Sequence, residues 1–154
     1  LENALIKARA ASVASGLPAL AEDSGLEVDA LGGAPGLYSA RYAGAQARDA
    51  DNVARLLAAL ADVPAHGRTA RFRCAAVYLR TPDDPWPLLG LGIWEGHIAP
   101  APVGTGGFGY DPVFLPAGRM PSAAQLTPAD KLAASHRGQA LRALLAQIGT
   151  GPRA

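Results

Sequence analysis

The hydrophobic pattern of this chain changes period along its length, and it predicts both helices and strands. Residues 1–15 are rich in Ala, Leu, Lys and Arg and predict a helix that stops at Gly16, with Pro18 shortly after. A second helix is expected where apolar residues follow the i, i+3, i+4, i+7 spacing of one helical face. These residues are Val53, Leu56, Leu57 and Leu60.

Apolar runs of β-prone residues predict the strands. The first is a short buried run over residues 18–21, which we expect to deliver Glu22 and Asp23 at its end. Residues 26–31 predict a further strand or a turn, and the Gly-Gly-Ala-Pro-Gly stretch at residues 32–36 predicts a loop. Three more strands are expected at residues 71–80, 88–98 and 113–115.

The carboxyl-terminal part of the chain has the clearest helix signals. Thr127 is suited to an N-cap, with Pro128 at the first helical position and Asp130 in the first turn. A second helix is expected to restart at Ser135, with an apolar face that holds Leu141, Leu144, Leu145 and Ile148. Mixed strands and helices, with no repeat and no linker, predict one α/β domain over residues 1–154.

Composition narrows the class of protein. At 154 residues, with 49% hydrophobic and 18% charged residues, the chain predicts a soluble globular domain with a substantial core. No stretch reaches the roughly 18 apolar residues that a membrane helix needs, and a net charge of +1 argues against a general nucleic-acid surface. Cys74 is the single cysteine, which rules out an intrachain disulfide and suits a reducing cytoplasm.

The basic residues are unevenly divided, with 12 Arg and two Lys. Lys is a compact point charge with three rotatable donors, whereas Arg is a planar fork. A position that contacts a phosphate or the edge of a purine favours the point charge. We therefore single out Lys7 and Lys131 as candidates for a nucleotide site, with chance retention as the alternative.

The first of three glycine-flanked segments that carry candidate chemistry is Glu22-Asp23-Ser24-Gly25. Adjacent carboxylates are costly unless a cation or donors compensate them, and at a strand end they can hold Mg²⁺ together with phosphate oxygens. One carboxylate can also take a proton from an attacking water. Ser24 and the Gly25 amide can donate to phosphate. The alternative is an ordinary Asx turn at a strand end.

The second segment spans residues 106–112, with the sequence Gly-Gly-Phe-Gly-Tyr-Asp-Pro. Glycines on both sides of Phe108 allow a tight fold and leave the ring face free to stack on a base. Asp111 can accept hydrogen bonds from a base or ribose, and Pro112 is expected to hold Asp111 extended. The alternative is a glycine-rich hairpin loop with Phe108 in the core.

The third segment is Ser135-His136-Arg137-Gly138, at a predicted helix start, where backbone amides bind anions. His136 and Arg137 add donors that can reach a carbonyl oxygen on a base. The alternative is a capped helix with a His–Arg pair on its surface.

Together and in this order, these segments resemble the inosine triphosphate pyrophosphatase family over the whole chain. The matching signatures lie at residues 2–8, 22–26, 31–36, 38–42, 104–112 and 135–138. The resemblance implies an elongated α/β fold with a strongly curved mixed sheet and two lobes around a nucleotide cleft. It also implies a homodimer that uses Mg²⁺ to hydrolyse ITP, dITP and XTP to the monophosphate and pyrophosphate.

The resemblance also assigns roles to individual residues. Asp23 falls on the metal-binding, water-activating aspartate. Whether Glu22 helps Asp23 to orient the water stays open at this point. Lys7 and Ser24 fall on phosphate-side positions. The base and sugar pocket is assigned to Phe108, Gly109, Tyr110 and Asp111. Recognition of the base oxygens is assigned to Lys131, His136 and Arg137.

The sequence departs from the family pattern in one respect. The family carries an amino-terminal strand, a Thr/Ser-x-Asn-x-x-Lys phosphate loop and a further metal-binding Glu, and we expect the present sequence to begin after them. Two alternative functions stay open. One is a related pyrophosphatase for modified pyrimidine or methylated nucleotides, and the other is a nucleotide-binding module without catalysis.

Overall fold

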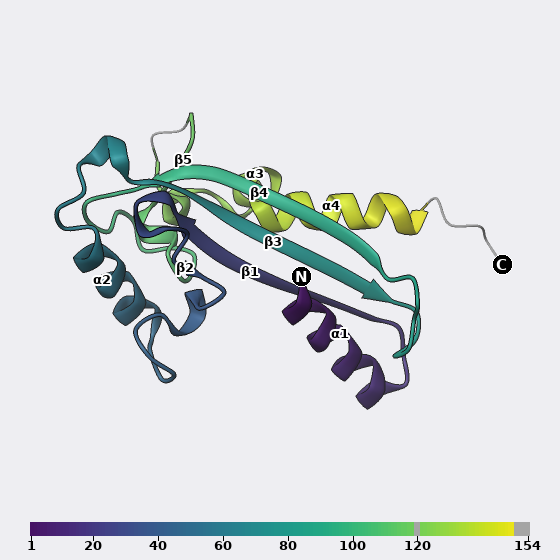
Figure 1. The fold of residues 1–154 in the computed structure, drawn as a ribbon. Coiled ribbons are helices and arrows are strands. Elements are labelled where there is room, and N and C mark those ends of the chain that lie inside the picture. The colour runs from purple at the N-terminus through teal and green to yellow at the C-terminus, as the bar shows by residue number, and fades with distance from the viewer. Residues whose placement is uncertain (119–120, 150–154) are drawn as a thin grey trace. The chain divides into compact units, whose positions relative to one another are not determined.

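The computed structural model describes residues 1–118 and 121–149 and has a mixed α/β fold, as the sequence predicts (Figure 1). The four α-helices of the described residues are α1 (Glu2–Ser15), α2 (Asp49–Ala59), α3 (Pro128–Ala134) and α4 (His136–Gly149). Its strands are β1 (Ala19–Val28), β2 (Pro35–Gly36), β3 (Thr69–Leu79), β4 (Leu88–Ile98) and β5 (Phe114–Pro116). None of these helices is both long and apolar enough to cross a membrane.

The five described strands form one sheet in the order β2-β1-β3-β4-β5. Two ladders are antiparallel: Leu26 pairs with Gly36 between β1 and β2, and Gly96 pairs with Pro116 between β4 and β5. The chain divides into two compact units. Of the described residues, the first unit comprises 1–24, 73–93 and 132–149, and the second comprises 25–72, 94–118 and 121–131.

In the first unit, alternate residues of β3 pack against different helices. Val77 and Leu79 form a buried cluster with Ala4 and Ala8 of α1. On the opposite face, Cys74 and Ala76 pack with two residues of α4, Ala140 and Leu144. Because successive side chains of a strand point to opposite faces of a sheet, α1 and α4 cover opposite faces of this part of the sheet.

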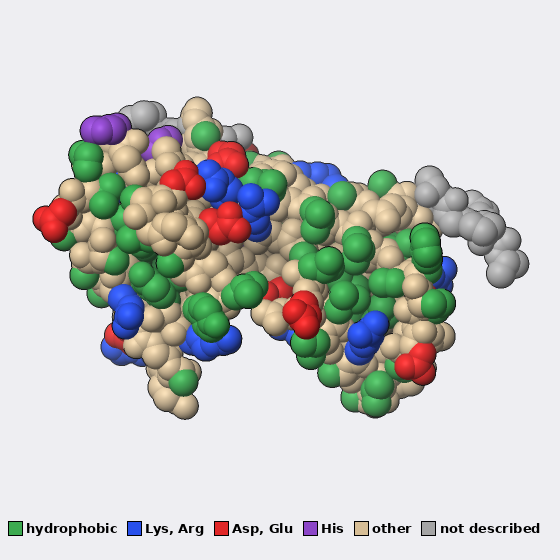
Figure 2. Space-filling view, in the orientation of Figure 1, with side chains coloured by type: hydrophobic (Ala, Val, Ile, Leu, Met, Phe, Trp, Pro, Cys, Tyr) green, Lys and Arg blue, Asp and Glu red, His purple; other side chains and the backbone are tan. Residues whose placement is uncertain are grey.

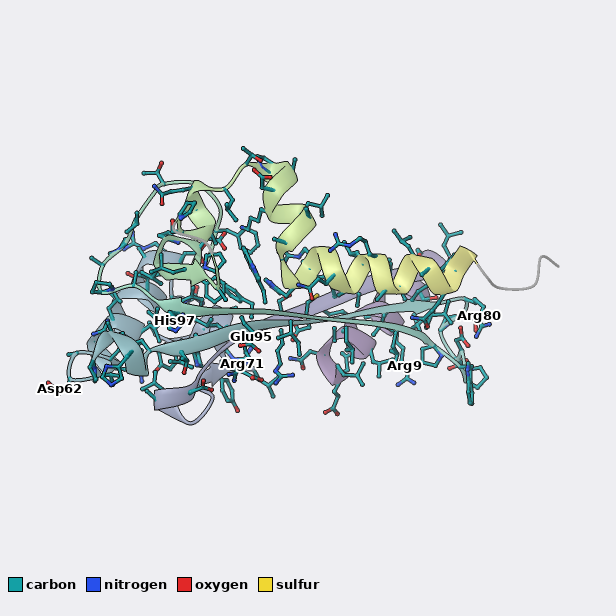
Figure 3. The ribbon with its side chains drawn as sticks, turned by 90° about the horizontal axis from the view of Figure 1, so that it is seen from above. Arg9, Asp62, Arg71, Arg80, Glu95 and His97 are labelled. Atoms are coloured by element: carbon teal, nitrogen blue, oxygen red, sulfur yellow. The ribbon has the colours of Figure 1, made fainter. Side chains whose placement is uncertain are left out.

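Two glycines of β4 let α4 lie close to the strand, and Figure 3 shows α4 running along the strands. A Cβ atom at Gly90 would come within 2.0 Å of the Ala140 carbonyl oxygen, and one at Gly92 within 1.9 Å of the His136 carbonyl oxygen. Any side chain at either position would push the helix away. The two glycines therefore permit the close approach of α4 to β4.

The second unit has an aromatic centre. The Phe114 ring lies 4.7 Å from the Phe72 ring and 5.2 Å from the Trp94 ring, measured between centroids. Arg71, which precedes Phe72 on β3, forms ion pairs with Asp29 at 2.8 Å and Glu95 at 3.0 Å. Figure 3 shows Arg71 and Glu95 on the same side of the strands, and Figure 2 shows basic and acidic side chains gathered on that surface.

Several element boundaries differ from the prediction. The first strand does not end at Ala21 but runs on through Glu22 and Asp23 to Val28. The 3₁₀ turn Asp111–Val113 precedes β5, so Asp111 is part of a turn rather than extended.

The helix predictions fare better. Helix α1 ends at Gly16 with a φ of 69°, as predicted. Helix α4 buries Leu144 as predicted, but Leu145 is 59% exposed and Ile148 is 39% exposed, so the predicted apolar face is only partly correct.

Candidate functional site

Asp23 lies on the face of β1 that α1 covers. Its Oδ1 accepts a hydrogen bond from Lys7 Nζ at 2.5 Å, and its Oδ2 accepts one from Asn3 Nδ2 at 3.2 Å. Asn3 and Lys7 are four residues apart on α1, so they share one side of the helix. The Lys7 side chain is 54% exposed and that of Asp23 is 20% exposed, so the pair is open to solvent and to a ligand.

Glu22, the neighbour of Asp23, points to the opposite face of the strand. Its Oε1 pairs with the Arg137 guanidinium, at 2.8 Å from Nη2 and 3.0 Å from Nε. Its Oε2 accepts hydrogen bonds from Ser24 Oγ at 2.8 Å and Cys74 Sγ at 3.4 Å. Glu22 is therefore not placed to help Asp23 orient a water, because consecutive strand residues point apart.

The environment of Glu22 favours its ionised form. Burial acts to raise the pKa of this carboxyl, but the hydrogen bond from Ser24 and the charge and hydrogen bond of Arg137 outweigh it and lower the pKa below 4.5. Burial raises the pKa of the Cys74 thiol to about 11, so the thiol stays protonated and can donate near neutral pH. The group is thus a charged pair supported by two further donors.

In the second unit, Asp111 organises the glycine-rich segment. Its side chain is 5% exposed, and its Oδ2 accepts the Phe108 backbone N–H at 2.7 Å and also pairs with Lys131. The ammonium of Lys131 lies over the Phe108 ring, 4.5 Å from the centroid. Phe108 itself remains 56% exposed, so it is a surface aromatic rather than a core residue.

Glycine is required next to this carboxylate. Gly107 has a φ of +74°, and a Cβ there would lie 2.2 Å from Asp111 Oδ2. The next glycine, Gly109, donates its backbone N–H to Asp49 Oδ2 at 2.6 Å. Two aspartates therefore hold the loop: Asp111 accepts the Phe108 N–H, and Asp49 accepts the Gly109 N–H.

Tyr110 is buried, in contrast to Phe108. It is 4% exposed, and its hydroxyl donates to the Ser39 carbonyl oxygen at 2.8 Å. Burial raises the pKa of the Tyr110 hydroxyl well above its ordinary value. In this arrangement Tyr110 supports the loop from within, and Phe108 provides the exposed aromatic face.

The two polar residues at the start of α4 have different environments. His136 is 7% exposed, and its backbone packs against Gly92. The Arg137 side chain is 34% exposed and is held by Glu22. Arg137 is thus the more accessible of the two predicted base-recognition residues.

Comparison with known proteins gives a clear family. A model of the Ham1 family matches residues 1–147. This chain belongs to the Ham1 family. A curated relative from Shigella flexneri, named dITP/XTP pyrophosphatase, is 56% identical over 151 residues, which is 98% of this chain and 77% of the relative. A relative of the same name from Methylococcus capsulatus is 59% identical over 148 residues, covering 96% of this chain and 74% of the relative.

Solved structures of Ham1 proteins agree with the fold. A HAM1 protein from Coxiella burnetii superposes with a TM-score of 0.90 at 47% identity, covering 97% of this chain and 76% of that one. A nucleoside-triphosphatase / dITP/XTP pyrophosphatase from Mycobacterium abscessus superposes with a TM-score of 0.77 at 49% sequence identity, covering 96% of this chain and 74% of that one. The family resemblance and the mixed α/β fold predicted from the sequence are confirmed.

The Ham1 chain brings its predicted site residues together in three groups. In the first group, Lys7 forms an ion pair with Asp23. In the second, Ser24 and Arg137 both bind the carboxylate of Glu22. In the third, Lys131 pairs with Asp111 and lies over the ring of Phe108. Sequence reasoning missed Asn3, although its spacing of four from Lys7 on a helix was a usable signal. It also missed Asp49, which lies 60 residues from its partner Gly109, and no local pattern marks that contact.

The expected Mg²⁺ can be tested against the donors at Asp23. Among residues 1–118 and 121–149, no group of three or more His, Cys, Asp or Glu side chains could hold a metal ion. Mg²⁺ usually binds through one or two carboxylates, with substrate phosphates and waters as further ligands. The hard oxygens of Asp23 fit an ion that is shared with a triphosphate. Since Lys7 lies 2.5 Å from Asp23 Oδ1, the ammonium must shift when a second cation binds there.

Proposed function

We propose that this protein hydrolyses ITP, dITP and XTP to the nucleoside monophosphate and pyrophosphate. The observation that carries the proposal is the similarity to dITP/XTP pyrophosphatases, at 56% identity over 98% of the chain. The three groups of side chains described above supply the parts that such a reaction needs.

At the phosphate side, Asp23 acts on the attacking water. The water oxygen forms a bond to the α-phosphorus, its proton passes to the Asp23 carboxylate, and the bond from the α-phosphorus to the bridging oxygen breaks. Mg²⁺, when bound by Asp23 and the phosphates, neutralises negative charge on the phosphate oxygens. The ammonium of Lys7 moves from Asp23 to the departing pyrophosphate and stabilises its charge. The Ser24 hydroxyl, predicted on this side, donates to Glu22 in the structure.

At the base side, Phe108 offers the exposed ring on which a purine stacks, with Asp111 and Lys131 holding the loop in place. Arg137 and His136 donate to the base carbonyl. Hypoxanthine and xanthine carry a carbonyl where adenine carries an amino group, which cannot accept these hydrogen bonds. A site with donors left unsatisfied by the wrong base rejects that base strongly.

The direct test is the product of the reaction. The protein, supplied with Mg²⁺ and ITP, is expected to release IMP and pyrophosphate, and to act far more slowly on ATP. Release of IDP and phosphate, or binding of ITP without turnover, would contradict the proposal. A panel that includes modified pyrimidine and methylated nucleotides separates the related pyrophosphatase activity, since such an enzyme would prefer those substrates to ITP.

We also propose that the protein is a cytoplasmic homodimer. The loop at residues 32–44 exposes two large apolar side chains, Leu37 at 70% and Tyr38 at 59%, and Arg41 lies 5.1 Å from the Tyr38 ring centroid. Tyr and Arg are enriched at protein interfaces. Sedimentation at micromolar concentration is expected to show a dimer that Tyr38→Glu weakens. A wild-type protein that sediments as a monomer would contradict this part of the proposal.

A further inference from the structure

Glu22 has no part in the chemistry proposed at Asp23, yet both of its oxygens are engaged. Arg137, from α4 and 115 residues away in sequence, contacts Oε1 with both Nη2 and Nε. Ser24 on the same strand and Cys74 on β3 donate to Oε2. Three elements therefore converge on one carboxylate that is only 28% exposed.

The contact between Glu22 and Arg137 sets the orientation of the guanidinium as well as balancing its charge. The guanidinium is a rigid planar fork with five N–H donors. When Nε and Nη2 are both held on one carboxylate oxygen, the plane of the fork is set, and so is the direction of its other donors. Ser24 and Cys74 in turn prevent the carboxylate from rotating. The Cys74 thiol is protonated near neutral pH and donates to Oε2 at 3.4 Å.

We propose that Glu22 is a positioning residue that orients Arg137 for recognition of the base carbonyl, so that selectivity for ITP over ATP depends on Glu22. The proposal rests on the proposed function in one respect, because it takes Arg137 to donate to the base. Two consecutive residues of β1 then serve two tasks from opposite faces of the strand: Asp23 the phosphate chemistry, and Glu22 the choice of base.

The test is the ratio of kcat/KM for ITP to that for ATP. Glu22→Gln keeps the shape of the side chain but removes its charge, and the ratio is expected to fall roughly tenfold, the scale of one charged hydrogen bond. General damage to the fold would lower both rates together and leave the ratio unchanged. Glu27→Gln is the matched control, because Glu27 lies on the same strand with its carboxylate 3.9 Å from a different arginine, Arg71. It is expected to leave the ratio unchanged.

A double variant sharpens the result. If Glu22 acts through Arg137, then Glu22→Gln combined with Arg137→Ala lowers the ratio no further than Arg137→Ala alone. Additive losses, an unchanged ratio in Glu22→Gln, or an unchanged ratio in Arg137→Ala would each overturn the proposal. Should Glu22→Gln not fold, Arg137→Lys keeps the positive charge but loses the planar fork, and a preserved ratio in that variant would overturn the proposal as well.

Failure of the proposed function is visible separately. Dissociation constants for ITP and ATP, measured by calorimetry without Mg²⁺, give the same ratio from protein that does not turn over. A wild-type protein that prefers ITP in binding but releases no pyrophosphate contradicts the function and leaves the role of Glu22 to be tested by the binding ratio.

Discussion

The two lysines of the chain each pair with an aspartate, one pair in each unit, and the environments of the two pairs differ. Lys7 and Asp23 are 54% and 20% exposed, whereas Lys131 and Asp111 are 19% and 5% exposed. An ion pair in contact with water contributes little to stability and opens readily. Separating a buried pair leaves a charge without compensation and is costly. The first pair is therefore suited to exchange partners with a ligand, and the second to hold a structure in place.

The surroundings of the two pairs support this difference. Within residues 1–118 and 121–149, two side chains donate to Asp23: Lys7 and Asn3, both from α1. Asp111 also accepts the Phe108 N–H, and its lysine covers the Phe108 ring. A lysine–aspartate pair thus serves the proposed reaction in the first unit and holds the Phe108 loop in the second. The difference in burial of the two pairs accounts for the two roles.

The largest effect is expected at the two aspartates. Asp23→Asn should lower turnover of ITP by about 10³-fold, because it removes the metal ligand and the base together, while the melting temperature stays near the wild-type value. Asp111→Asn should instead lower the melting temperature, because Lys131 loses its partner. Asp62→Asn, at an exposed position, controls for the substitution itself. Near-normal turnover in Asp23→Asn would show that Asp23 has been given the wrong role.

Two phenylalanines separate base binding from packing. Phe108→Ala should weaken nucleotide binding by about 1–3 kcal/mol, the scale of stacking on an aromatic ring, and change the melting temperature little because Phe108 is 56% exposed. Phe114→Ala should lower the free energy of unfolding by about 3–5 kcal/mol, because Phe114 is fully buried. Calorimetric binding and thermal melts check both. If Phe108→Ala lost stability but kept its affinity for the nucleotide, Phe108 would be a packing residue and the assigned role in base binding would be wrong.

The smallest effect concerns the pH dependence of Glu22, a third paired carboxylate. Its folded-state pKa is lowered from 4.5, so its ionised form contributes stability above pH 4.5, and this contribution is lost as the pH falls through the folded-state pKa. The free energy of unfolding of the wild type should exceed that of Glu22→Gln by at most about 1 kcal/mol at pH 7, since the pair is partly exposed. Urea titrations should show this difference shrinking below pH 4.5. If the difference in the free energy of unfolding between wild type and Glu22→Gln grew below pH 4.5, the folded-state pKa of Glu22 would be raised and not lowered.

The sequence predicted those features that depend on local signals. The helix that ends at Gly16 and the strand from Leu88 to Ile98 are marked by a C-cap glycine and a β-prone run, and both have the expected bounds. The course of β1 was missed because Glu22 to Gly25 reads as a polar turn. In the structure, partners distant in sequence satisfy these polar residues, and Gly25 lets the strand approach the Gly36 carbonyl oxygen.

Only part of the candidate site could be predicted from the sequence. The rarity of lysine pointed to Lys7 and Lys131, and each meets an aspartate of a predicted segment. The separation of Glu22 from Asp23 onto two faces follows from the strand that was missed at these residues. The different burial of the two lysine–aspartate pairs depends on the packing of elements that are distant in sequence. No pattern local to these residues encodes that packing.

The most direct test of the proposed division of roles compares Lys7→Met with Lys131→Met in one experiment that measures both the free energy of unfolding and kcat/KM for ITP. Lys7→Met should change stability by less than about 1 kcal/mol and lose most of the activity. Lys131→Met should lose about 3 kcal/mol of stability, and its activity loss should lie mainly in KM as the Phe108 loop loosens. Equal stability losses in the two variants, or full activity in Lys7→Met, would contradict the account.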